Sequence, residues 1–285
     1  MTDLTAISSR ERRSGRWSLL LAVPVALLSI APLLWALVSA LRPGSEIFAH
    51  MSPFTWQTII PTELTFDNFE RLLGGSFTAA LVNSVIVAAI GVVVGLIVSA
   101  LAAYALATLP FRGRSTVFSL MVLSFLIPFE AIAIPLASSF RQFGLQDTIV
   151  GLALPAVGNG LTIFLLRQFF LNIPPSLAEA ARVDGASWFG VFWRIYLPLS
   201  KAPLVGGGLI LFVFQWQAFL WPLLIAPSPQ RQLAPVALAN LAGQNGVDYG
   251  QMFAGTILTA AVPLLLLLFF QRQFTSSLAS TGSKE

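Results

Sequence analysis

Long uncharged stretches constrain this chain more than any other feature of its sequence. Neither Trp17 to Leu41 nor Ser76 to Leu109 contains an Asp, Glu, Lys or Arg. About 20 consecutive apolar residues are enough to cross the hydrocarbon core of a bilayer. Charged residues make up only 10% of the chain, against about 25% in soluble domains. The sequence therefore predicts an integral membrane protein.

Six segments are predicted to span the membrane. They are Trp17 to Leu41, a stretch within Ser76 to Leu109, and about Ser115 to Phe140, Thr148 to Leu166, Pro203 to Ile225 and Met252 to Phe270. Because backbone groups in lipid must be hydrogen-bonded within the protein, runs of this length favour a helical bundle over a barrel of short alternating strands. We expect an all-α membrane protein with a six-helix domain over residues 17–275. Loosely ordered polar tails are expected at 1–16 and 276–285.

The distribution of Lys and Arg predicts the orientation of these spans. If both termini are cytoplasmic, the outer segments hold only Arg42, Arg71, Arg141 and Arg231. The cytoplasmic segments then hold Arg10, Arg12, Arg13, Arg16, Arg112, Arg114, Arg167, Arg182, Arg194, Lys201, Arg272 and Lys284. Cytoplasmic loops of membrane proteins carry an excess of Lys and Arg, so both termini are predicted to be cytoplasmic. The same bias places residues 172–200, between spans four and five, in the cytoplasm.

A polar segment, "EAARVDGASWFGVFWRIYLP", interrupts the apolar chain between spans four and five and predicts two short helices. The first is expected to begin at Ser176 as N-cap, with Glu179 three residues later completing a capping box. It should end at Gly185, which can adopt the left-handed conformation of a helix C-terminus. The second is expected to run from Ser187 until Pro198 stops it. The segment is thus predicted to be a helix-turn-helix at the inner end of the bundle.

Asp184 is poorly placed for its own helix. A negative charge at a helix C-terminus is unfavourable by about 0.3 to 1 kcal/mol, so we expect a compensating partner, either Arg182 or a group on another subunit. From the physical pattern alone, the segment could equally be an amphipathic helix pair that lies on the membrane with a solvated charged face.

The spacing of these residues resembles the EAA loop of ABC importer permeases, which reads E-A-A, three residues, Gly, nine residues, then I-x-L-P. The matching residues are Glu179, Ala180, Ala181, Gly185, Ile195, Leu197 and Pro198. The wider chain, over about residues 17–275, is similar to the smaller, six-helix subunit of the maltose-type carbohydrate permeases. That similarity includes "TFDNF", "LVNS", "FRGRS", "IFLLRQFF" and "WPLL".

The resemblance implies a type I ABC importer permease fold in the plasma (inner) membrane of a bacterium or archaeon. It implies four partners besides the lipid bilayer: a second homologous permease, two cytoplasmic ATPase subunits and an external substrate-binding protein. Glu179, Ala180, Ala181, Asp184 and Gly185 would contact a groove on an ATPase subunit. ATP and Mg would be bound there, so this chain would be neither an enzyme nor the holder of a cofactor.

Two alternatives to carbohydrate import remain open. Related permeases carry glycerol-phosphate compounds, and a stand-alone secondary transporter would also have many spans. The second alternative predicts its own coupling site and often inverted repeats, whereas we find no convincing repeat here. A membrane enzyme would need clustered His, Asp or Ser groups at one interface, which the sequence does not offer.

Several chemistries are excluded by what the sequence lacks. No Walker A sequence occurs, since "VGGGLIL" has glycines but no Lys. There is one histidine, His50, and no cysteine, so neither a two-His metal site nor thiolate chemistry is expected. No basic cluster is interleaved with exposed aromatics, so nucleic acid is not an expected partner.

Polar residues within the predicted spans are candidates for the substrate pathway. Glu130 interrupts span three, and an ionised group at the bilayer centre costs about 2.5 to 3.5 kcal/mol. The other candidates are Gln215, Trp216, Gln217 and Trp221 in span five, and, more weakly, Asn83 and Asn159. Trp faces stack on sugar rings and amides bond to hydroxyls. The alternatives are packing or interfacial anchoring for Trp and interhelical hydrogen bonds for Asn.

Three further local patterns predict structure outside the cytoplasmic segment. Small residues at Gly91, Gly95, Ser99 and Ala103 share one face of span two and predict close helix packing. In "DNFE", Asp67 is expected to be the N-cap of a short outer helix, with Glu70 as its capping-box partner. The outer loop 226–251 is expected to contain no helix beyond a turn near "PVALANLA".

Overall fold

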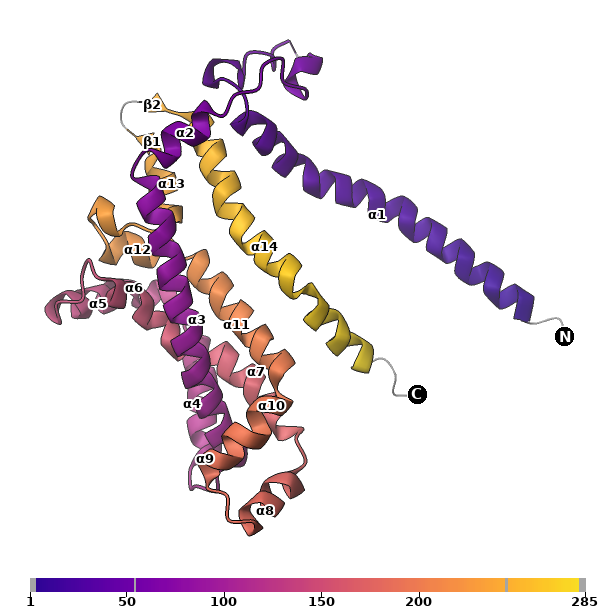
Figure 1. Ribbon diagram of the computed structural model, residues 1–285, viewed down its shortest axis with the longest axis vertical. Helices are drawn as coiled ribbons and strands as arrows, with labels where there is room; N and C mark the ends of the chain where they lie inside the picture. The colour runs from indigo at the N-terminus through magenta and orange to yellow at the C-terminus, as the bar shows by residue number, and fades with distance from the viewer. Residues whose placement is uncertain (1–3, 54, 244–245, 282–285) are drawn as a thin grey trace. The chain divides into compact units, whose positions relative to one another are not determined.

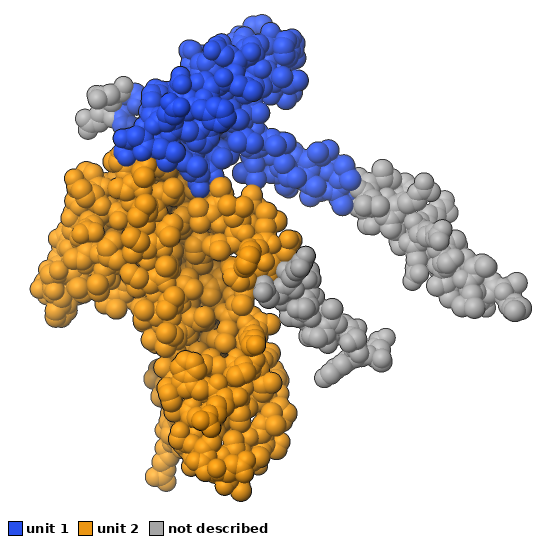
Figure 2. Space-filling view, viewed as in Figure 1, with its two compact units in different colours: residues 1–75, 241–258 blue, residues 76–240, 259–285 orange. Residues whose placement is uncertain are grey.

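The computed structural model is mostly helical, as the long apolar runs predict (Figure 1). It describes residues 4–53, 55–243 and 246–281, with side chains described between residues 22 and 271. The chain divides into two compact units (Figure 2). Unit 1 contains residues 1–75 and 241–258, and unit 2 contains residues 76–240 and 259–285.

The elements follow a simple order in which 3₁₀ turns, labelled η, separate the helices; η4 alone is π-helical. The order is α1 (Leu4–Ala40), η1 (Gly44–Glu46), η2 (Trp56–Thr58), α2 (Asp67–Leu73), α3 (Phe77–Thr108), α4 (Arg114–Phe125), α5 (Phe129–Gln142), α6 (Ile149–Ala153), η3 (Leu154–Gly158), α7 (Gly160–Leu171), α8 (Pro175–Val183), α9 (Trp188–Val191), η4 (Phe192–Tyr196), α10 (Leu197–Leu199), α11 (Lys201–Trp216), α12 (Leu220–Ile225), η5 (Pro229–Arg231), α13 (Ala234–Asn240), β1 (Ala242–Gly243), β2 (Gly246–Val247) and α14 (Tyr249–Thr281).

Three of the described helices are long and apolar enough to cross a membrane unbroken: Ala22–Ala40 of α1, all of α3, and Tyr249–Gln271 of α14. Three bent helix pairs bring the number to six if each pair is one span. The bends are 96° between α4 and α5, 40° between η3 and α7, and 85° between α10 and α11. The single helix predicted over 115–140 is therefore two helices. Pro128 explains the break, because it has no N–H to donate and disfavours helical geometry in the residue before it.

Helix α3 is the centre of unit 2 and packs most extensively against α7 and α11. Its small residues allow this close approach. A Cβ on Gly91 would lie 3.3 Å from the Cβ of Ala156 in η3, which leads into α7, and one on Gly95 would lie 3.3 Å from Cδ1 of Leu211 in α11. Gly207 of α11 approaches Thr162 of α7 equally closely. The predicted small face of α3 is confirmed: Gly91, Gly95, Ser99 and Ala103 are all buried.

Unit 1 is held together by the side chain of Asn68, which is 1% exposed. Its Nδ2 donates to the carbonyl oxygens of Ala40 (2.9 Å) and Arg42 (2.8 Å), at the end of α1. Its Oδ1 accepts from Nη2 of Arg71 at 2.9 Å. The start of α14 also passes close by, and a Cβ on Gly250 would overlap the Asn68 side chain. One amide therefore joins α1, α2 and α14 in this unit.

Two charged groups in unit 1 have shifted pKa values. Burial lowers the pKa of Arg42, with the charge of Glu46 opposing the shift. For Asp248, burial opposes ionisation, but hydrogen bonds from Gln251 and the charge of Arg71 outweigh it and hold the carboxyl pKa below its ordinary value. Asp248 forms a 3.2 Å salt bridge with Arg71. This ion pair connects α2 with the residues that lead into α14.

Local details differ from the sequence predictions at several helix ends. Asp67 is the first residue of α2, not its N-cap; Phe66 holds that position, and the Asp67 N–H donates to Thr65 Oγ1. The outer loop contains a seven-residue helix, α13, instead of a single turn. Helices α1 and α14 extend into the predicted tails, to Leu4 and Thr281. The rest of those tails lies outside the described residues.

We expect Asn68→Ala to destabilise unit 1 by about 1 to 3 kcal/mol, because two buried carbonyl oxygens lose their donors. Limited proteolysis within residues 43–66, followed by mass spectrometry, measures this as faster cleavage. Glu63→Ala is the matched control, since Glu63 is exposed in the same loop and forms no hydrogen bond within the described residues. Equal cleavage rates in the two variants would contradict the assignment of Asn68.

Candidate functional site: the coupling segment

Residues 172–200, which we call the coupling segment because they resemble the EAA loop, form the predicted helix-turn-helix. One helix cap differs from the prediction. Helix α8 begins at Pro175 with Pro174 in the N-cap position, and no side chain caps it. The prediction that Ser176 and Glu179 form a capping box is therefore wrong. Proline is preorganised for the first helical position and has no N–H that needs a partner, so the Pro174–Pro175 pair starts the helix.

The turn between the two helices follows the prediction. Gly185 has a φ of +85°, in the left-handed region. The Gly185 N–H donates to the Arg182 carbonyl, and the Ala186 N–H donates to the Ala181 carbonyl at 2.9 Å. Ser187 is the N-cap of α9 and its hydroxyl accepts from the Gly190 N–H at 3.1 Å. Glycine conformation and serine capping thus set the angle between α8 and α9.

The second helix differs from a simple α-helix that stops before Pro198. Helix α9 continues as the π-helical segment η4 and then as α10, so Pro198 lies inside the helical stretch. The stretch ends at Leu199, and Ser200 turns the chain by 85° into α11. A π-helical turn widens the backbone spiral, and such turns are frequent at functional sites. Ile195 lies in this turn and Leu197 directly follows it.

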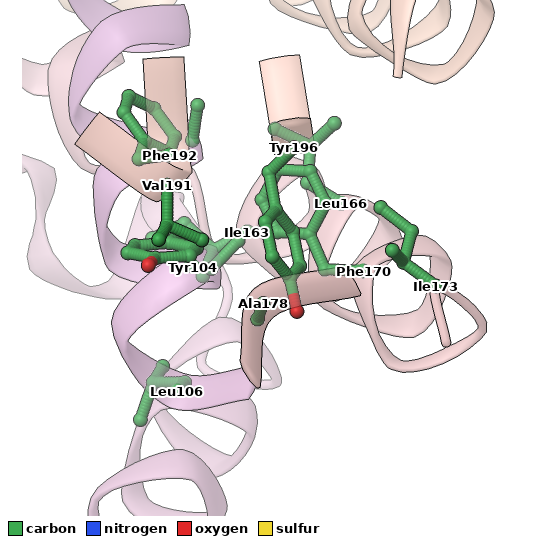
Figure 3. Packing of buried hydrophobic residues seen from close by; sticks show 12 residues of the cluster. Tyr104, Leu106, Ile163, Leu166, Phe170, Ile173, Ala178, Val191, Phe192 and Tyr196 are labelled. Carbon is green, nitrogen blue, oxygen red and sulfur yellow. The ribbon is translucent and has the colours of Figure 1, made fainter. Parts of the chain in front are cut away.

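Four aromatic side chains fix the segment to the spans; we call them the aromatic clamp (Tyr104, Phe170, Phe192 and Tyr196). Figure 3 shows them in one buried cluster, with Tyr104 on α3 and Phe170 on α7. The ring centroid of Tyr104 lies 5.1 Å from that of Phe192 and 4.9 Å from that of Tyr196. Phe170 meets Tyr196 edge-on at 5.5 Å. The Tyr104 hydroxyl donates to the Trp188 carbonyl at 2.9 Å.

The motif residues divide between the two sides of α8. Ala178 is buried, and Ala181 packs against the cluster that contains the clamp. Glu179, Ala180, Arg182, Val183, Asp184 and Gly185 are exposed. Val183 is 88% exposed, an unusual state for an aliphatic residue within a packed segment. We call these six residues, four on α8 and two directly after it, the outer face of α8.

Asp184 has no ion-pair partner within the described residues, where the only salt bridge is Arg71–Asp248. Arg182, one of its two expected partners, donates instead to the Ala186 carbonyl and lies 4.9 Å above the Trp188 ring. The expectation that Arg182 compensates Asp184 is therefore wrong. A cationic group on another subunit stays a prediction.

A pocket of about 590 Å³ lies behind α8, between it and the ends of α3 and α7. Glu179 and Arg182 contribute charged groups to its wall, and Thr108, Trp188 and Tyr196 contribute to the rest. The Oγ1 of Thr108 is buried without a hydrogen-bond partner in the structure. Glu179 is thus accessible both from outside and from this pocket.

Three of the predicted pathway residues are buried in the packing of unit 2. Trp216 is 3% exposed, and its Nε1 donates to the Thr259 carbonyl at 3.0 Å. Trp221 is 4% exposed, and its Nε1 donates to the Gly151 carbonyl at 3.0 Å. Gln215 is also buried, and its Nε2 has no hydrogen-bond partner among the described residues. Both indole N–H groups are therefore already used in joining helices.

The two asparagines make backbone contacts. Asn83 Nδ2 donates to the carbonyl oxygens of Gln230 (2.8 Å) and Gln232 (3.2 Å), which ties the outer loop to α3. Asn159 is the N-cap of α7, and its Oδ1 accepts from the Thr162 N–H at 2.9 Å.

Glu130 and Gln217 differ from the other pathway candidates. Both side chains are exposed, and neither forms a hydrogen bond or ion pair within the described residues. Each stands next to a break in a helix: Glu130 in the first turn of α5, and Gln217 at the C-terminal end of α11. These two therefore retain free polar groups.

Comparison with known proteins shows the relationships of the chain. Residues 91–279 match the family described as binding-protein-dependent transport system inner membrane component. The arabinooligosaccharides transport system permease protein AraQ of Halalkalibacterium halodurans is 32% identical, over 91% of this chain and 93% of its own length. The trehalose transport system permease protein SugB of Mycobacterium tuberculosis is 33% identical, over 96% and 98%. The sn-glycerol-3-phosphate transport system permease protein UgpE of Yersinia pestis is 33% identical, over 90% and 92%.

The fold is also similar to solved structures. A chain of a bacterial ABC transporter involved in the import of the acidic polysaccharide alginate has a TM-score of 0.76 at 22% identity, covering 93% of this chain and 97% of that one. A second structure, of the bacterial alginate ABC transporter in complex with an alginate pentasaccharide-bound periplasmic protein, has a TM-score of 0.66 at 18% identity, covering 94% and 97%. The chain therefore has the fold of an ABC importer permease.

Tyr104→Phe is expected to loosen the coupling segment, because the Trp188 carbonyl loses its donor at a cost of about 1 kcal/mol. Tyr104→Ala should cost about 3 to 5 kcal/mol, since it also leaves a cavity in the clamp. Thermal unfolding of the purified chain in detergent measures both effects. Tyr249→Phe is the control, as the Tyr249 hydroxyl has no hydrogen bond in the described structure. If Tyr104→Phe and Tyr249→Phe unfold at the same temperature, the Tyr104 hydroxyl does not hold the segment.

Proposed function

This chain belongs to the binding-protein-dependent transport system inner membrane components, and we propose that it forms half of the translocation pathway of an ATP-driven ABC importer for a carbohydrate. It is a permease subunit, and ATP hydrolysis belongs to a separate subunit. The proposed complex contains this chain, a second homologous permease, two cytoplasmic ATPase subunits that bind ATP and Mg, and an extracytoplasmic substrate-binding protein. The family to which the chain belongs supports this composition.

The observation that carries the coupling role is the contrast between the two sides of α8. One side packs against the buried cluster through Ala178 and Ala181, and the aromatic clamp fixes η4, farther along the segment, to α3 and α7. The outer face exposes Glu179, Val183 and Asp184. A segment that is packed on one side and exposed on the other can transmit displacement as a rigid body. We propose that the outer face docks on the ATPase subunit.

The mechanism follows from these attachments. When the ATPase subunits close on ATP, they displace α8, and the clamp passes that displacement to the ends of α3 and α7. The displacement also reaches α11, which follows the segment after the 85° turn at Ser200. Because packed interfaces move as units instead of deforming continuously, a shift of the segment changes the tilt of the helices that line the pathway. Access to the pathway then alternates between the two sides of the membrane.

We propose the membrane placement that the sequence predicts: six spans, three of them bent, with both termini in the cytoplasm. The family name supports an inner-membrane location, and the bias of Lys and Arg supports the orientation. We place the protein in the plasma membrane of a bacterium or archaeon. In this orientation, α8, α9 and the first turn of α4 are cytoplasmic.

The names of the relatives and the negative charge of Glu130 both bear on the substrate class. AraQ and SugB are named for arabinooligosaccharides and trehalose, whereas UgpE is named for sn-glycerol-3-phosphate. We propose that Glu130 and Gln217 face the pathway, because they alone among the candidates are exposed and form no side-chain hydrogen bond within the described residues. A carboxylate there disfavours an anionic solute through like-charge repulsion. A sugar or oligosaccharide is therefore preferred over a glycerol-phosphate compound, which stays the alternative.

Copurification tests the importer assignment. The affinity-tagged chain, purified from the cells in which it naturally occurs, is expected to bring an ATPase subunit with it, as a stand-alone secondary transporter would not. Glu179→Lys reverses a charge on the outer face and is expected to lower ATPase recovery and uptake at least tenfold, which corresponds to about 1.4 kcal/mol. Arg141→Gln, an exposed charge on α5, is the control. Full ATPase recovery with Glu179→Lys would show that Glu179 is not part of the docking surface.

Uptake selectivity tests the pathway. Glu130→Gln removes the charge at nearly constant shape, so it is expected to raise the ratio of glycerol-phosphate to sugar uptake several-fold. Gln217→Ala is expected to lower sugar uptake without changing that ratio, because it removes hydrogen bonds but no charge. Uptake of radiolabelled trehalose, an arabinooligosaccharide and glycerol 3-phosphate into cells measures both. An unchanged ratio with Glu130→Gln would place Glu130 outside the pathway.

A further inference from the structure

Two arginines contact the last turn of α3 in unit 2, and a third lies in the turn that follows it. Nε of Arg167, on α7, donates to the Leu106 carbonyl at 3.1 Å. Nη1 of Arg114, the first residue of α4, donates to the Ala107 carbonyl at 3.3 Å. The two carbonyls are consecutive, so the two guanidinium groups are neighbours, and their like charges repel each other. Arg112 lies exposed in the turn that leads to α4. We call these three residues the arginine cluster.

The cluster lacks a counter-charge. No carboxylate among the described side chains lies within 4.0 Å of any of its members, since the only salt bridge there is Arg71–Asp248. The C-terminus of α3 offers roughly half a negative charge, which does not balance two guanidinium groups. Each guanidinium has five N–H donors, and Arg114 and Arg167 each use one on a backbone carbonyl. Several charged donors therefore remain free.

Arg167 is also held in place from the other side. Its guanidinium carbon lies 3.9 Å from the centre of the Phe118 ring, and that ring stacks on Phe164 at 6.0 Å. A cation over an aromatic face is attracted to it and loses rotational freedom. Because an immobilised side chain has already lost its conformational entropy, it binds a ligand at lower entropic cost. Arg167 is thus a fixed, partly buried and uncompensated positive charge.

An apolar strip begins beside the cluster. Val117, Leu120 and Leu123 follow at three-residue spacing along α4, and all three are about half exposed or more. Residues at this spacing lie on neighbouring positions of a helix surface. Phe111, in the turn before α4, is exposed too. A site with positive charge at one end and an exposed aliphatic strip at the other matches the chemistry of a phospholipid.

We propose that the arginine cluster binds the phosphate of an anionic phospholipid in the cytoplasmic leaflet, with an acyl chain along Val117, Leu120 and Leu123 of α4. This inference rests on the proposed orientation, in which the cluster faces the cytoplasm. Basic sites between spans on that side suit anionic headgroups. The aliphatic strip favours a lipid over both free phosphate and an acidic protein surface, neither of which would cover it.

The proposed lipid site lies next to the aromatic clamp, so a bound lipid would affect how the coupling segment is attached to α3. Leu106, whose carbonyl is bonded to Arg167, belongs to the same buried cluster as the aromatic clamp. A bound phosphate between Arg114 and Arg167 would remove their mutual repulsion and stabilise the end of α3. The lipid would thus strengthen the attachment point from which the coupling segment moves the spans.

Native mass spectrometry of the purified full-length chain, with any subunits that copurify, tests the proposal. The protein is exchanged into mixed micelles containing equal amounts of phosphatidylglycerol and phosphatidylcholine, and the ratio of the two bound lipids is measured. The wild type is expected to retain phosphatidylglycerol selectively. Arg114→Gln and Arg167→Gln should each reduce that selectivity roughly fivefold, the effect expected for one charge near an anionic surface. Arg114→Lys should retain most of it.

Lys201→Gln is the matched control, because it removes one exposed positive charge on the same side of the membrane, at the start of α11. An equal fall in Lys201→Gln, or no fall in the two arginine variants, would overturn the proposal. So would complete displacement of phosphatidylglycerol by an equal concentration of inorganic phosphate, which would indicate a site for a free anion. Loss of the ATPase from the arginine variants, with lipid selectivity intact, would identify a protein-docking surface instead.

The readout is independent of transport. Absence of an ATPase from the wild-type preparation would count against the importer assignment and leave the lipid ratio measurable. A variant that aggregates on gel filtration is misfolded, so its loss of selectivity does not support the proposal. In that case Arg114→Lys decides the proposal, because it keeps the charge and a donor for the Ala107 carbonyl. If folded Arg114→Lys shows no selectivity for phosphatidylglycerol over phosphatidylcholine in the same mixed micelles, while Lys201→Gln keeps it, the proposal is wrong.

Discussion

The close approach of α3 to its neighbours is the constraint on which unit 2 depends. In lipid there is little hydrophobic force between helices, so packing requires backbones that come close together. Gly91 and Gly95 provide this, because any side chain there would meet Ala156 at 3.1 to 3.3 Å. With α3 held against α7 and α11, its two ends are defined. Near one end of α3, Asn83 donates a hydrogen bond to the outer loop. Near the other end, Tyr104 contacts the coupling segment.

The coupling segment, which we propose moves the spans, is itself built from closely packed elements. Its local geometry is set by Gly185 and Ser187, and its attachment by four aromatic rings on three different elements. Helix α8 contributes Ala178 and Ala181 to the packing around these rings. A force applied to the outer face therefore reaches α3 and α7 directly, and the arginine cluster lies where that force arrives. The breaks next to Glu130 and Gln217 place the remaining free polar groups within the same unit.

The coupling segment was more predictable than the substrate pathway, for a physical reason. A glycine at a left-handed position and a serine that caps a helix act within a few residues, so local sequence reveals them. Even so, Ser176 was misassigned, because the Pro174–Pro175 pair competes for the same helix start. The tryptophans of "FQWQAFLWP" were chemically suited to a sugar, but both indole N–H groups bond to backbone carbonyls far away in the sequence. Periodicity cannot reveal such partners.

By itself, the sequence determined that the chain crosses a membrane as helices, where the helix-turn-helix lies, and that it carries the EAA spacing. These properties follow from the length of apolar runs, the distribution of charge and the turn chemistry of single residues, all of which are local. Only the tertiary structure decided that Tyr104 anchors the coupling segment and that Arg114 and Arg167 lie together without a counter-charge. Tyr104 contacts residues more than 60 positions away, and the two arginines meet on consecutive carbonyls of a third helix. Such contacts depend on which helices pack together, which no local pattern specifies.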